Sequence, residues 1–248
     1  MGSEAVHLRR RLADAREDRI GRCSRTRGRI GATEVDLVVS GIGLINAAAA
    51  TAALCALDPP AVLLNYGCAG AHRDDIGPGV VILGERIVHV SSLVILPSGE
   101  RKPMGFDYHV GGTRMQTEAI SADRALLDLA RAAAARVELP CWPGSDEPPR
   151  IVTGTVASAD VWTQHHDSIH TLHDQHGSLC EEMEAAAVAQ VAATYGIPFL
   201  AVKDISNNEL RNSTALTRQG WPSLDSLDDQ LGLRAAVVVE ALIASLAW

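Results

Sequence analysis

AVLLNYGCAG, residues 61–70, is the stretch of sequence that decides the fold class of this chain. Its first four residues are all apolar, which is typical of a strand that is buried on both faces of a sheet. Polar residues and glycines follow directly, at the point where such a strand ends. Because ligands bind at the carboxyl ends of strands in α/β sheets, this segment predicts a buried strand that leads into a binding site.

Strand and helix patterns alternate on both sides of this stretch. Before it, an Ala-rich helix over 46–57 is stopped by Asp58-Pro59-Pro60, since proline cannot continue a helix. We expect further strands over 34–39, 80–94, 151–157 and 199–205, and further helices over 4–18, 121–137, 167–175, 183–195 and 231–246. Residues 140–149 and 209–228 are expected to be loops. This alternation predicts an α/β fold with a central mixed, mostly parallel twisted sheet that is flanked by helices.

Composition excludes several classes of partner. The 248 residues are 47% hydrophobic and carry a formal net charge of −8 without a basic stripe, so binding to a nucleic-acid backbone is not expected. No apolar run approaches the roughly 18 residues of a membrane span. The five cysteines form no CxxC pair, which favours free thiols in a reducing compartment. We therefore expect a soluble, cytoplasmic protein.

Two further segments resemble the end of the first stretch. Gly41-Ile42-Gly43 follows the expected strand over 34–39, and Ser206-Asn207 follows the strand over 199–205. Glycine lets a backbone approach a ligand closely, and backbone amides can donate hydrogen bonds to it. All three segments would meet at one edge of a parallel sheet, which predicts a shared site.

Three carboxylates stand at the start of the Ala-rich helix over 183–195. Favourable interaction with the helix dipole would explain Glu181 and Glu182. Glu184 is followed by three alanines, so its carboxylate needs a partner or access to a cavity. A sugar diol would be such a partner, because one carboxylate can accept hydrogen bonds from both hydroxyl groups. The spacing alone leaves both interpretations open.

Several blocks together resemble the methylthioadenosine/S-adenosylhomocysteine nucleosidases, which belong to the superfamily of nucleoside phosphorylases and nucleosidases. The blocks are SGIGLINA (40–47), NYGCAG (65–70), MGFDY (104–108), SADVW (158–162), EMEAAA (182–187) and KDISN (203–207). They occur in the family's order and spacing. The resemblance implies a single domain over 1–248 that cleaves a purine nucleoside by hydrolysis, without a cofactor or a metal ion.

The resemblance also implies a role for each matching residue. Glu4 would be the general base that activates water, Glu184 would hold the ribose hydroxyls, and Asn207 would face purine N7. The remaining substrate-binding positions are implied to be Met1 and Ile42 at the 5′ substituent, Met183 under the sugar, Trp162 and Thr163 beside the purine, and Cys68, Ala69, Gly70, Glu182 and Ser206 around them. The family forms homodimers, so Met104 and Phe106 are expected to reach the active site of the neighbouring subunit.

The sequence departs from the family pattern at the residues that would face the purine base. The family's Ser-Asp pair is Ser206-Asn207 here, and an amide can donate a hydrogen bond but cannot deliver a proton as an acid does. Asparagine at this place resembles the futalosine hydrolases and the phosphorylases that are specific for 6-oxopurines. A hypoxanthine-type base is therefore an alternative to adenine.

A second departure concerns the nucleophile. Phosphorylases of the superfamily hold phosphate with arginines beside the glycine turns, and no arginine stands at residues 41–44 or 65–67. Arg73 and Arg86 lie outside the expected positions. Water is therefore the expected nucleophile. Phosphorolysis and a non-catalytic nucleoside-binding role remain the alternatives.

The third departure is at the N-terminus. The family begins with a buried strand that leads into a turn matching residues 1–4. Either the sheet lacks this strand, or the given start lies downstream of it, or the first residues are vector-derived. A missing strand would leave unpaired amides in the sheet and loosen the placement of Glu4.

Three other patterns in the sequence point to different functions, each more weakly. The spacing of His166, His170 and His173 on one helical face is compatible with zinc, although a surface helix explains it better. Gly41-Ile42-Gly43 lacks the third glycine of a dinucleotide-binding motif. No nucleophile elbow accompanies Ser158, so a serine hydrolase is not expected.

Overall fold

The computed structural model describes residues 2–144, 148–211 and 229–246. Its helices are α1 (Gly2–Arg9), α2 (Leu44–Leu57), α3 (Arg124–Ala134), α4 (His166–His176), α5 (Ala185–Tyr195) and α7 (Leu233–Ser245). Its strands are β1 (Ala13–Ile20), β2 (Cys23–Ile30), β3 (Thr33–Val39), β4 (Leu63–Ala71), β5 (Val81–His89), β6 (Leu93–Ile95), β7 (Arg101–Pro103), β8 (Phe106–Val110), β9 (Thr113–Thr117), β10 (Ala119–Ser121), β11 (Ile151–Ser158), β12 (Ser178–Glu182) and β13 (Phe199–Asn207). Strands and helices alternate from α3 onward, and a mixed sheet is flanked by helices, so the α/β class is confirmed.

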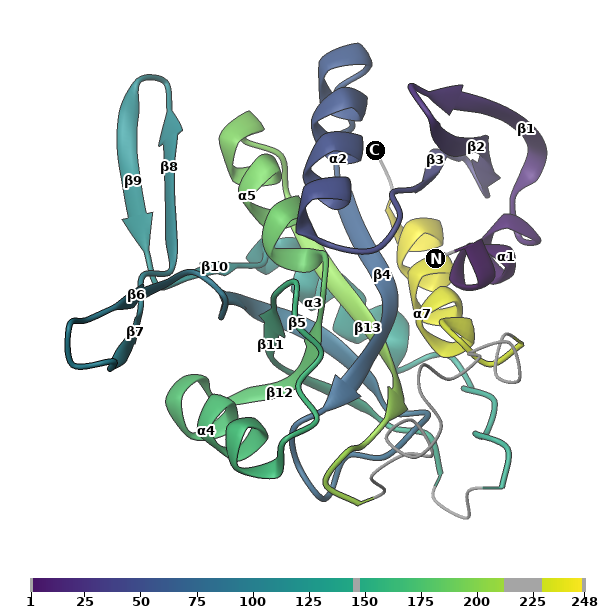
Figure 1. Cartoon of the computed structure of the whole chain (residues 1–248). Coiled ribbons are helices and arrows are strands. Elements are labelled where there is room, and N and C mark those ends of the chain that lie inside the picture. The colour runs from purple at the N-terminus through teal and green to yellow at the C-terminus, as the bar shows by residue number, and fades with distance from the viewer. Residues whose placement is uncertain (1, 145–147, 212–228, 247–248) are drawn as a thin grey trace.

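The central sheet is mixed and has the strand order β10-β5-β11-β12-β4-β13. Strands β5, β11 and β12 are parallel to one another, and β4 is parallel to β13. Antiparallel pairing of β13 with β5 closes the five strands β5, β11, β12, β4 and β13 into a ring, and β10 pairs with β5 outside it (Figure 1). The ring places the carboxyl ends of β4 and β13 next to each other.

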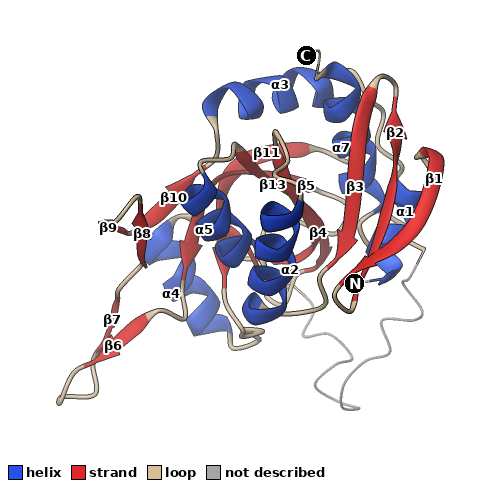
Figure 2. Cartoon of the chain, turned by 90° about the horizontal axis from the view of Figure 1, so that it is seen from above, coloured by secondary structure: helices blue, strands red, loops and turns tan. Residues whose placement is uncertain are grey.

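Helices cover the sheet on two sides (Figure 2). On one side α2 packs against α5, and four of the buried residues of α5 are the small residues Ala185, Ala186, Ala189 and Ala192, each at most 1% exposed. Small side chains let a helix approach a sheet closely, which explains the alanine content of both helices. On the other side α3 packs against β5 and β13, α7 packs against β13, and α1 packs against α7 and β3, with leucine and valine side chains buried between them. Among the described residues, no helix is long and apolar enough to cross a bilayer.

The helix expected over 4–18 is wrong. The first helix ends at Arg9, and residues 13–20 form β1, which pairs antiparallel with β2. Arg25 of β2 donates two hydrogen bonds to the Asp18 carboxylate of β1: Nε to Oδ1 at 2.6 Å, and Nη2 to Oδ2. Pairing with a strand that comes later in the chain therefore overrides a local pattern of helix-forming residues.

The helix expected to begin at Met183 also needs correction. Residues 178–182 form the buried strand β12, and the helix begins at Ala185. The two acids Glu181 and Glu182 therefore end a strand and do not open a helix. Their burial comes from the neighbours β11 and β4, which local sequence does not reveal.

Two strands face each other across a gap. β3 pairs with β2 alone, and β4 pairs with β12 only at Gly70 and Ala71, so within the described ranges no strand lies between β3 and β4. A cavity of about 1060 Å³ occupies this gap. The cavity runs along both strands and ends beside the N-terminal helix α1.

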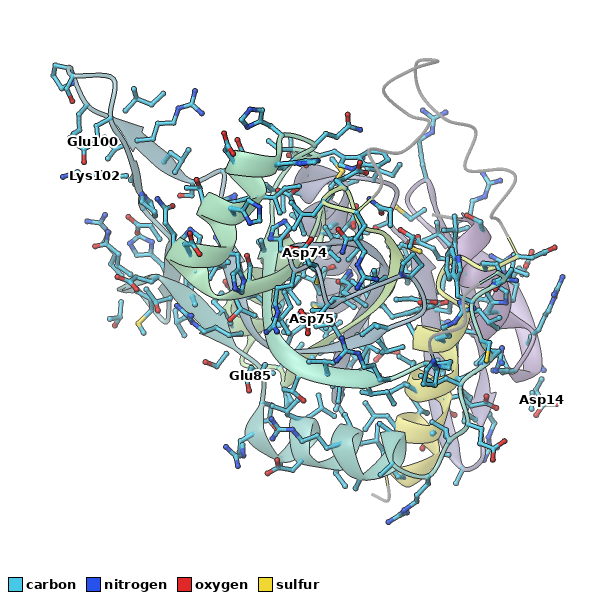
Figure 3. All side chains as sticks on the ribbon, turned by 90° about the horizontal axis from the view of Figure 1, so that it is seen from below. Asp14, Asp74, Asp75, Glu85, Glu100 and Lys102 are labelled. Atoms are coloured by element: carbon cyan, nitrogen blue, oxygen red, sulfur yellow. The ribbon has the colours of Figure 1, made fainter. Side chains whose placement is uncertain are left out.

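Two hairpins extend from the body of the molecule. β6 pairs with β7 and β8 pairs with β9, and the two hairpins leave the main sheet in different directions (Figure 1). We call residues 93–117, which contain both hairpins, the arm. Glu100 and Lys102 lie near the tip of its β6–β7 hairpin, far from the helical layers (Figure 3). Several apolar side chains of the arm are exposed: Val94, Ile95, Met104, Val110 and Met115.

Candidate active site

Glu4 belongs to α1, and its side chain reaches the carboxyl end of β4. The backbone amide of Cys68 donates a hydrogen bond of 2.7 Å to Glu4 Oε1. The Tyr66 hydroxyl donates to the Glu4 backbone carbonyl at 3.1 Å. A Cβ atom at Gly67 would lie 2.8 Å from Glu4 Oε1, so glycine is what lets the carboxylate approach this strand. Tyr66, Gly67 and Cys68 of β4 thus together fix the position of Glu4.

Glu184 is the residue directly before α5, and its side chain reaches the glycine turn after β3. The amide of Gly43 donates a hydrogen bond of 2.8 Å to Glu184 Oε1. Gly43 has a φ of 98°, in the region that favours glycine, and a Cβ there would lie 2.8 Å from Asp160 Oδ1. The same oxygen of Asp160 accepts a 2.7 Å bond from the Leu44 amide. Two carboxylates therefore hold this turn.

A buried ion pair lies behind Glu184. Lys203 Nζ is 2.7 Å from Glu182 Oε2, and each side chain is 1% exposed. The Glu182 carboxylate also accepts from the amides of Glu184 and Ala185 at 2.9–3.1 Å. Glu182 was expected to bind substrate, but its oxygens are occupied inside the protein. Its geometry suits it to positioning Glu184 instead.

The two acids that the resemblance singled out are electrostatically coupled. Burial raises the pKa of the Glu184 carboxyl, and the positive charge of Lys203 opposes that effect. The negative charges of Glu182 and Glu4 raise the same pKa further. Both Glu4 and Glu184 line the cavity between β3 and β4, together with Ser40, Gly41 and Gly67. Residues that are 180 positions apart thus share one cavity.

The neighbouring strand ends form a second group of polar side chains. Asn207 of β13 is opposite Gly70 of β4, and Gly70 is opposite Glu181 of β12. A Cβ at Gly70 would lie 3.1 Å from Asn207 Nδ2, so the amide lies against this glycine. Glu181 accepts from the amide and hydroxyl of Thr163 at 2.9 and 3.0 Å, which holds the loop that carries Trp162. Burial raises the pKa of Glu181.

The other predicted residues fall into distinct environments. Cys68, Gly70, Trp162, Thr163, Met183 and Ser206 are half-buried, Ala69 is buried, and Ile42 is exposed. Met104 is 46% exposed on the arm. Phe106 is 1% exposed and packs with the His89 ring in the core of its own chain, so it is not available to a second subunit as expected. Met1 lies outside the described residues.

Sequence reasoning missed four functional neighbours, which are Asp160, Glu181, Lys203 and Glu209. Lys203 carried a usable signal, because a single cation in the apolar run over 199–205 requires a buried partner. Asp160 lies within a block of the resemblance. For Glu181 and Glu209 no local pattern indicated the role that their contacts now suggest.

The arginines considered for phosphate are engaged elsewhere. Arg73 Nε donates a 2.7 Å bond to Asp75, which is labelled in Figure 3. Arg86 Nη1 lies 3.4 Å from the His176 carbonyl. Neither residue lines the cavity that Glu4 and Glu184 share. In α4, His173 Nδ1 is 2.8 Å from the Ser178 carbonyl, and the part of the chain described holds no group of three metal-ligating side chains.

Comparison with known proteins agrees with this geometry. The family model of the phosphorylase superfamily matches residues 1–244. A 5′-methylthioadenosine/S-adenosylhomocysteine nucleosidase from Geobacillus kaustophilus is 31% identical over 208 residues, which cover 84% of this chain and 81% of that protein. A nucleosidase of the same name from a Geobacillus species is 26% identical over 247 residues, 99% of this chain and 96% of that protein.

Solved structures show the same fold. The S. pneumoniae nucleosidase with the transition-state inhibitor MT-ImmA superimposes with a TM-score of 0.75 at 24% identity, covering 100% of this chain and 96% of that one. The Neisseria meningitidis enzyme in complex with methylthio-immucillin-A gives a TM-score of 0.77 at 22% identity, with 99% and 96% covered. The chain therefore belongs to the phosphorylase superfamily and, within it, to the 5′-methylthioadenosine/S-adenosylhomocysteine nucleosidase family.

Proposed function

We propose that this protein is a purine nucleosidase that hydrolyses the N-glycosidic bond of a methylthioadenosine-like ribonucleoside. The observation that carries the proposal is the convergence of Glu4 and Glu184 on one cavity. The backbone amide of Cys68 in β4 holds Glu4 at 2.7 Å, and the amide of Gly43 in the turn after β3 holds Glu184 at 2.8 Å. Such an arrangement presents two acids to one sugar.

Hydrolysis needs a base for water and a partner for the sugar. Glu4 takes a proton from water, the water oxygen bonds to C1′, and the bond from C1′ to the purine nitrogen breaks with its electrons moving to the base. Glu184 accepts hydrogen bonds from the 2′ and 3′ hydroxyls. Its negative charge also stabilises the cation-like ribose of the transition state, which binds more tightly than the ground state.

The leaving purine gains negative charge and needs a donor. Asn207 supplies an N–H toward purine N7, and Trp162 lies against the ring. Cys68, Ala69, Gly70 and Ser206 form the walls around the base. Met183 lies under the sugar, and Ile42 faces the 5′ substituent. These assignments follow from the family and from the adjacency of Asn207, Gly70 and Glu181.

The nucleophile is water. Arg73 is paired with Asp75, and Arg86 contacts a backbone carbonyl, so these two cations are not gathered beside the glycine turns. Arginine forks and exposed helix N-termini are common phosphate-binding groups in proteins. At Gly43 the amide already donates to Glu184.

One chromatographic assay tests the function. The protein is incubated with methylthioadenosine, adenosine, inosine and futalosine, each with and without inorganic phosphate, and the released base and sugar are quantified. We expect release of base and free sugar without phosphate. Release that requires phosphate and yields a sugar phosphate would overturn hydrolysis, and tight binding without any release would indicate a binding protein.

We also propose that the enzyme is a cytoplasmic homodimer. All five cysteines are thiols, as a reducing compartment would keep them. The arm carries exposed apolar side chains, among them Met104, and such patches mark interaction surfaces. Light scattering should give twice the 26.3 kDa chain mass. Met104→Glu should weaken the dimer and raise KM, whereas an active monomer would contradict this proposal.

A further inference from the structure

The amide of Asn207 is held at both of its ends. The Ser206 hydroxyl donates a 2.9 Å hydrogen bond to Asn207 Oδ1. Asn207 Nδ2 in turn donates a 2.8 Å hydrogen bond to Glu209 Oε1. Glu209 is only 3% exposed, so this contact is protected from water. The side chain that faces the purine thus has a carboxylate as its neighbour.

The carboxylate decides which way the amide points. An ionised carboxylate only accepts hydrogen bonds, so it selects the NH₂ end of Asn207 and repels the oxygen end. One N–H of the amide is then used, and one N–H remains. The oxygen keeps one lone pair after accepting from Ser206. Asn207 can therefore offer the purine one donor and one acceptor, but not two donors.

The position of Glu209 is supported by the turn that carries it. Asn208 Nδ2 donates to the carbonyls of Arg73 and Ile76 at 2.8 and 2.7 Å. Its Oδ1 accepts from the Leu210 amide at 2.9 Å. Asn208 is 3% exposed. The turn after β13 is therefore fixed to the segment that follows β4, and Glu209 with it.

6-Aminopurines and 6-oxopurines differ in the hydrogen-bonding groups that they present at N7 and at the substituent on C6. A 6-aminopurine presents N7 as an acceptor and its amino group as a donor, which matches one N–H and one oxygen. A 6-oxopurine presents two acceptors, N7 and O6, and requires both hydrogens of an amide. A site that leaves a buried polar group unpaired discriminates strongly against the wrong ligand.

We propose that Glu209 is a specificity-determining residue, which locks Asn207 in the orientation that accepts 6-aminopurines and disfavours 6-oxopurines. This inference rests on the proposed function, because it places a purine against Asn207. With Glu209 as its neighbour, Asn207 is compatible with an adenine-type substrate and does not by itself indicate a hypoxanthine-type base. Glu209 acts through Asn207 and is a positioning residue, so it has no contact with the reacting atoms.

The test compares the two bases in the wild type and in Glu209→Gln. The measurements are kcat/KM for 5′-methylthioadenosine and 5′-methylthioinosine, together with the inhibition constants of adenine and hypoxanthine. We expect the wild type to favour the 6-amino compounds by at least about tenfold. In Glu209→Gln the neighbouring amide can offer either an oxygen or an NH₂ group, so Asn207 can turn and the preference should fall toward unity.

The outcomes separate the two proposals. A wild type that prefers the 6-oxo compounds, or a Glu209→Gln variant with unchanged preference, would overturn the role of Glu209 while leaving the nucleosidase function intact. If no nucleoside is cleaved by the wild type, the proposed function fails. Glu209→Asp keeps the carboxylate and should retain part of the preference. The wild-type measurement alone remains decisive if Glu209→Gln does not fold.

Discussion

Lys203 Nζ lies 2.7 Å from Glu182 Oε2, with both side chains 1% exposed, and this pair stands directly behind Glu184. The same Glu182 carboxylate accepts from the Glu184 amide at 3.1 Å. The lysine charge opposes the burial that raises the pKa of Glu184. A structural ion pair and the carboxylate that we propose to bind the sugar are thus parts of one network.

Replacing the lysine should damage both stability and activity. Lys203→Met leaves Glu182 buried without its cation, which should cost roughly 3–5 kcal/mol of unfolding free energy. It should also raise the pKa of Glu184, so that the activity of the folded variant recovers as the pH is increased. Denaturant titrations and a pH profile of kcat/KM measure the two effects. Glu182→Gln with Lys203→Met should regain part of the stability, and an unchanged pH profile would contradict the link to Glu184.

Removing either acid should abolish turnover in different ways. Glu4→Gln keeps an acceptor for the Cys68 amide but removes the base, so kcat should fall roughly 10²–10⁴-fold with little change in KM. Glu184→Gln keeps the bond from Gly43 but loses the charge beside the ribose, so KM should rise as kcat falls. Glu17→Gln is the matched control, since that side chain is 65% exposed. Wild-type kcat in Glu4→Gln would refute its role as base.

Restoring an acid beside the purine should accelerate cleavage. In Asn207→Asp the new carboxyl would stand next to Glu209, and two carboxyl groups that share a site hold one proton more tightly. That proton is then available to purine N7. We expect kcat for methylthioadenosine to rise at acidic to neutral pH and to fall at higher pH. A pH-independent loss of activity would show that the amide itself is required.

One buried histidine should make the stability depend on pH. His72 is 3% exposed, and its Nδ1 lies 2.8 Å from Ser178 Oγ. Burial lowers its pKa from 6.5 to about 4. Between pH 6.5 and about pH 4, His72 is protonated in the unfolded chain but stays neutral in the folded protein. Its contribution to the unfolding free energy is therefore fully present above pH 6.5 and is lost as the pH falls to about 4.

The size of that loss follows from the shift. It should reach roughly 3 kcal/mol near pH 4. His72→Gln keeps a polar partner for Ser178 without a titrating ring. The unfolding free energies of the wild type and this variant, measured from pH 7 to pH 4.5, should therefore converge as the pH falls. Parallel curves would exclude His72 as the source.

A strand between β3 and β4 should stabilise the protein. The edge of β4 over residues 63–67 and the free edge of β3 both line the cavity of about 1060 Å³. An extended apolar segment of about six residues, fused ahead of Met1, would span roughly 20 Å along this edge. We expect a rise in Tm of several degrees and higher activity, because Glu4 follows directly. A Gly/Ser segment of equal length is the control, and equal Tm values for both fusions would contradict the idea.

Local sequence was sufficient for the elements whose pattern repeats within one segment. The apolar runs within β11 and β13 and the Ala-rich helices α2 and α5 are recognisable by themselves. The strand expected over 61–64 is only partly right, because β4 runs over Leu63–Ala71 and includes the polar and glycine residues that were expected to follow it. The glycine turn at 41–43 and the glycines at 67 and 70, which lie within β4, also indicated a candidate site, since glycine there permits close approach by a side chain or ligand. These features establish the α/β class and the position of the site at the strand ends.

Only the tertiary structure decided which residues meet. Residues 13–20 became a strand and residues 178–182 became a buried strand because partners elsewhere in the chain supply their hydrogen bonds. The pairing of Lys203 with Glu182, and the convergence of Glu4 and Glu184, join segments that are 21 and 180 positions apart. Local periodicity records which face of a segment is apolar, but it contains no information on the distant segment that covers that face or neutralises its charge.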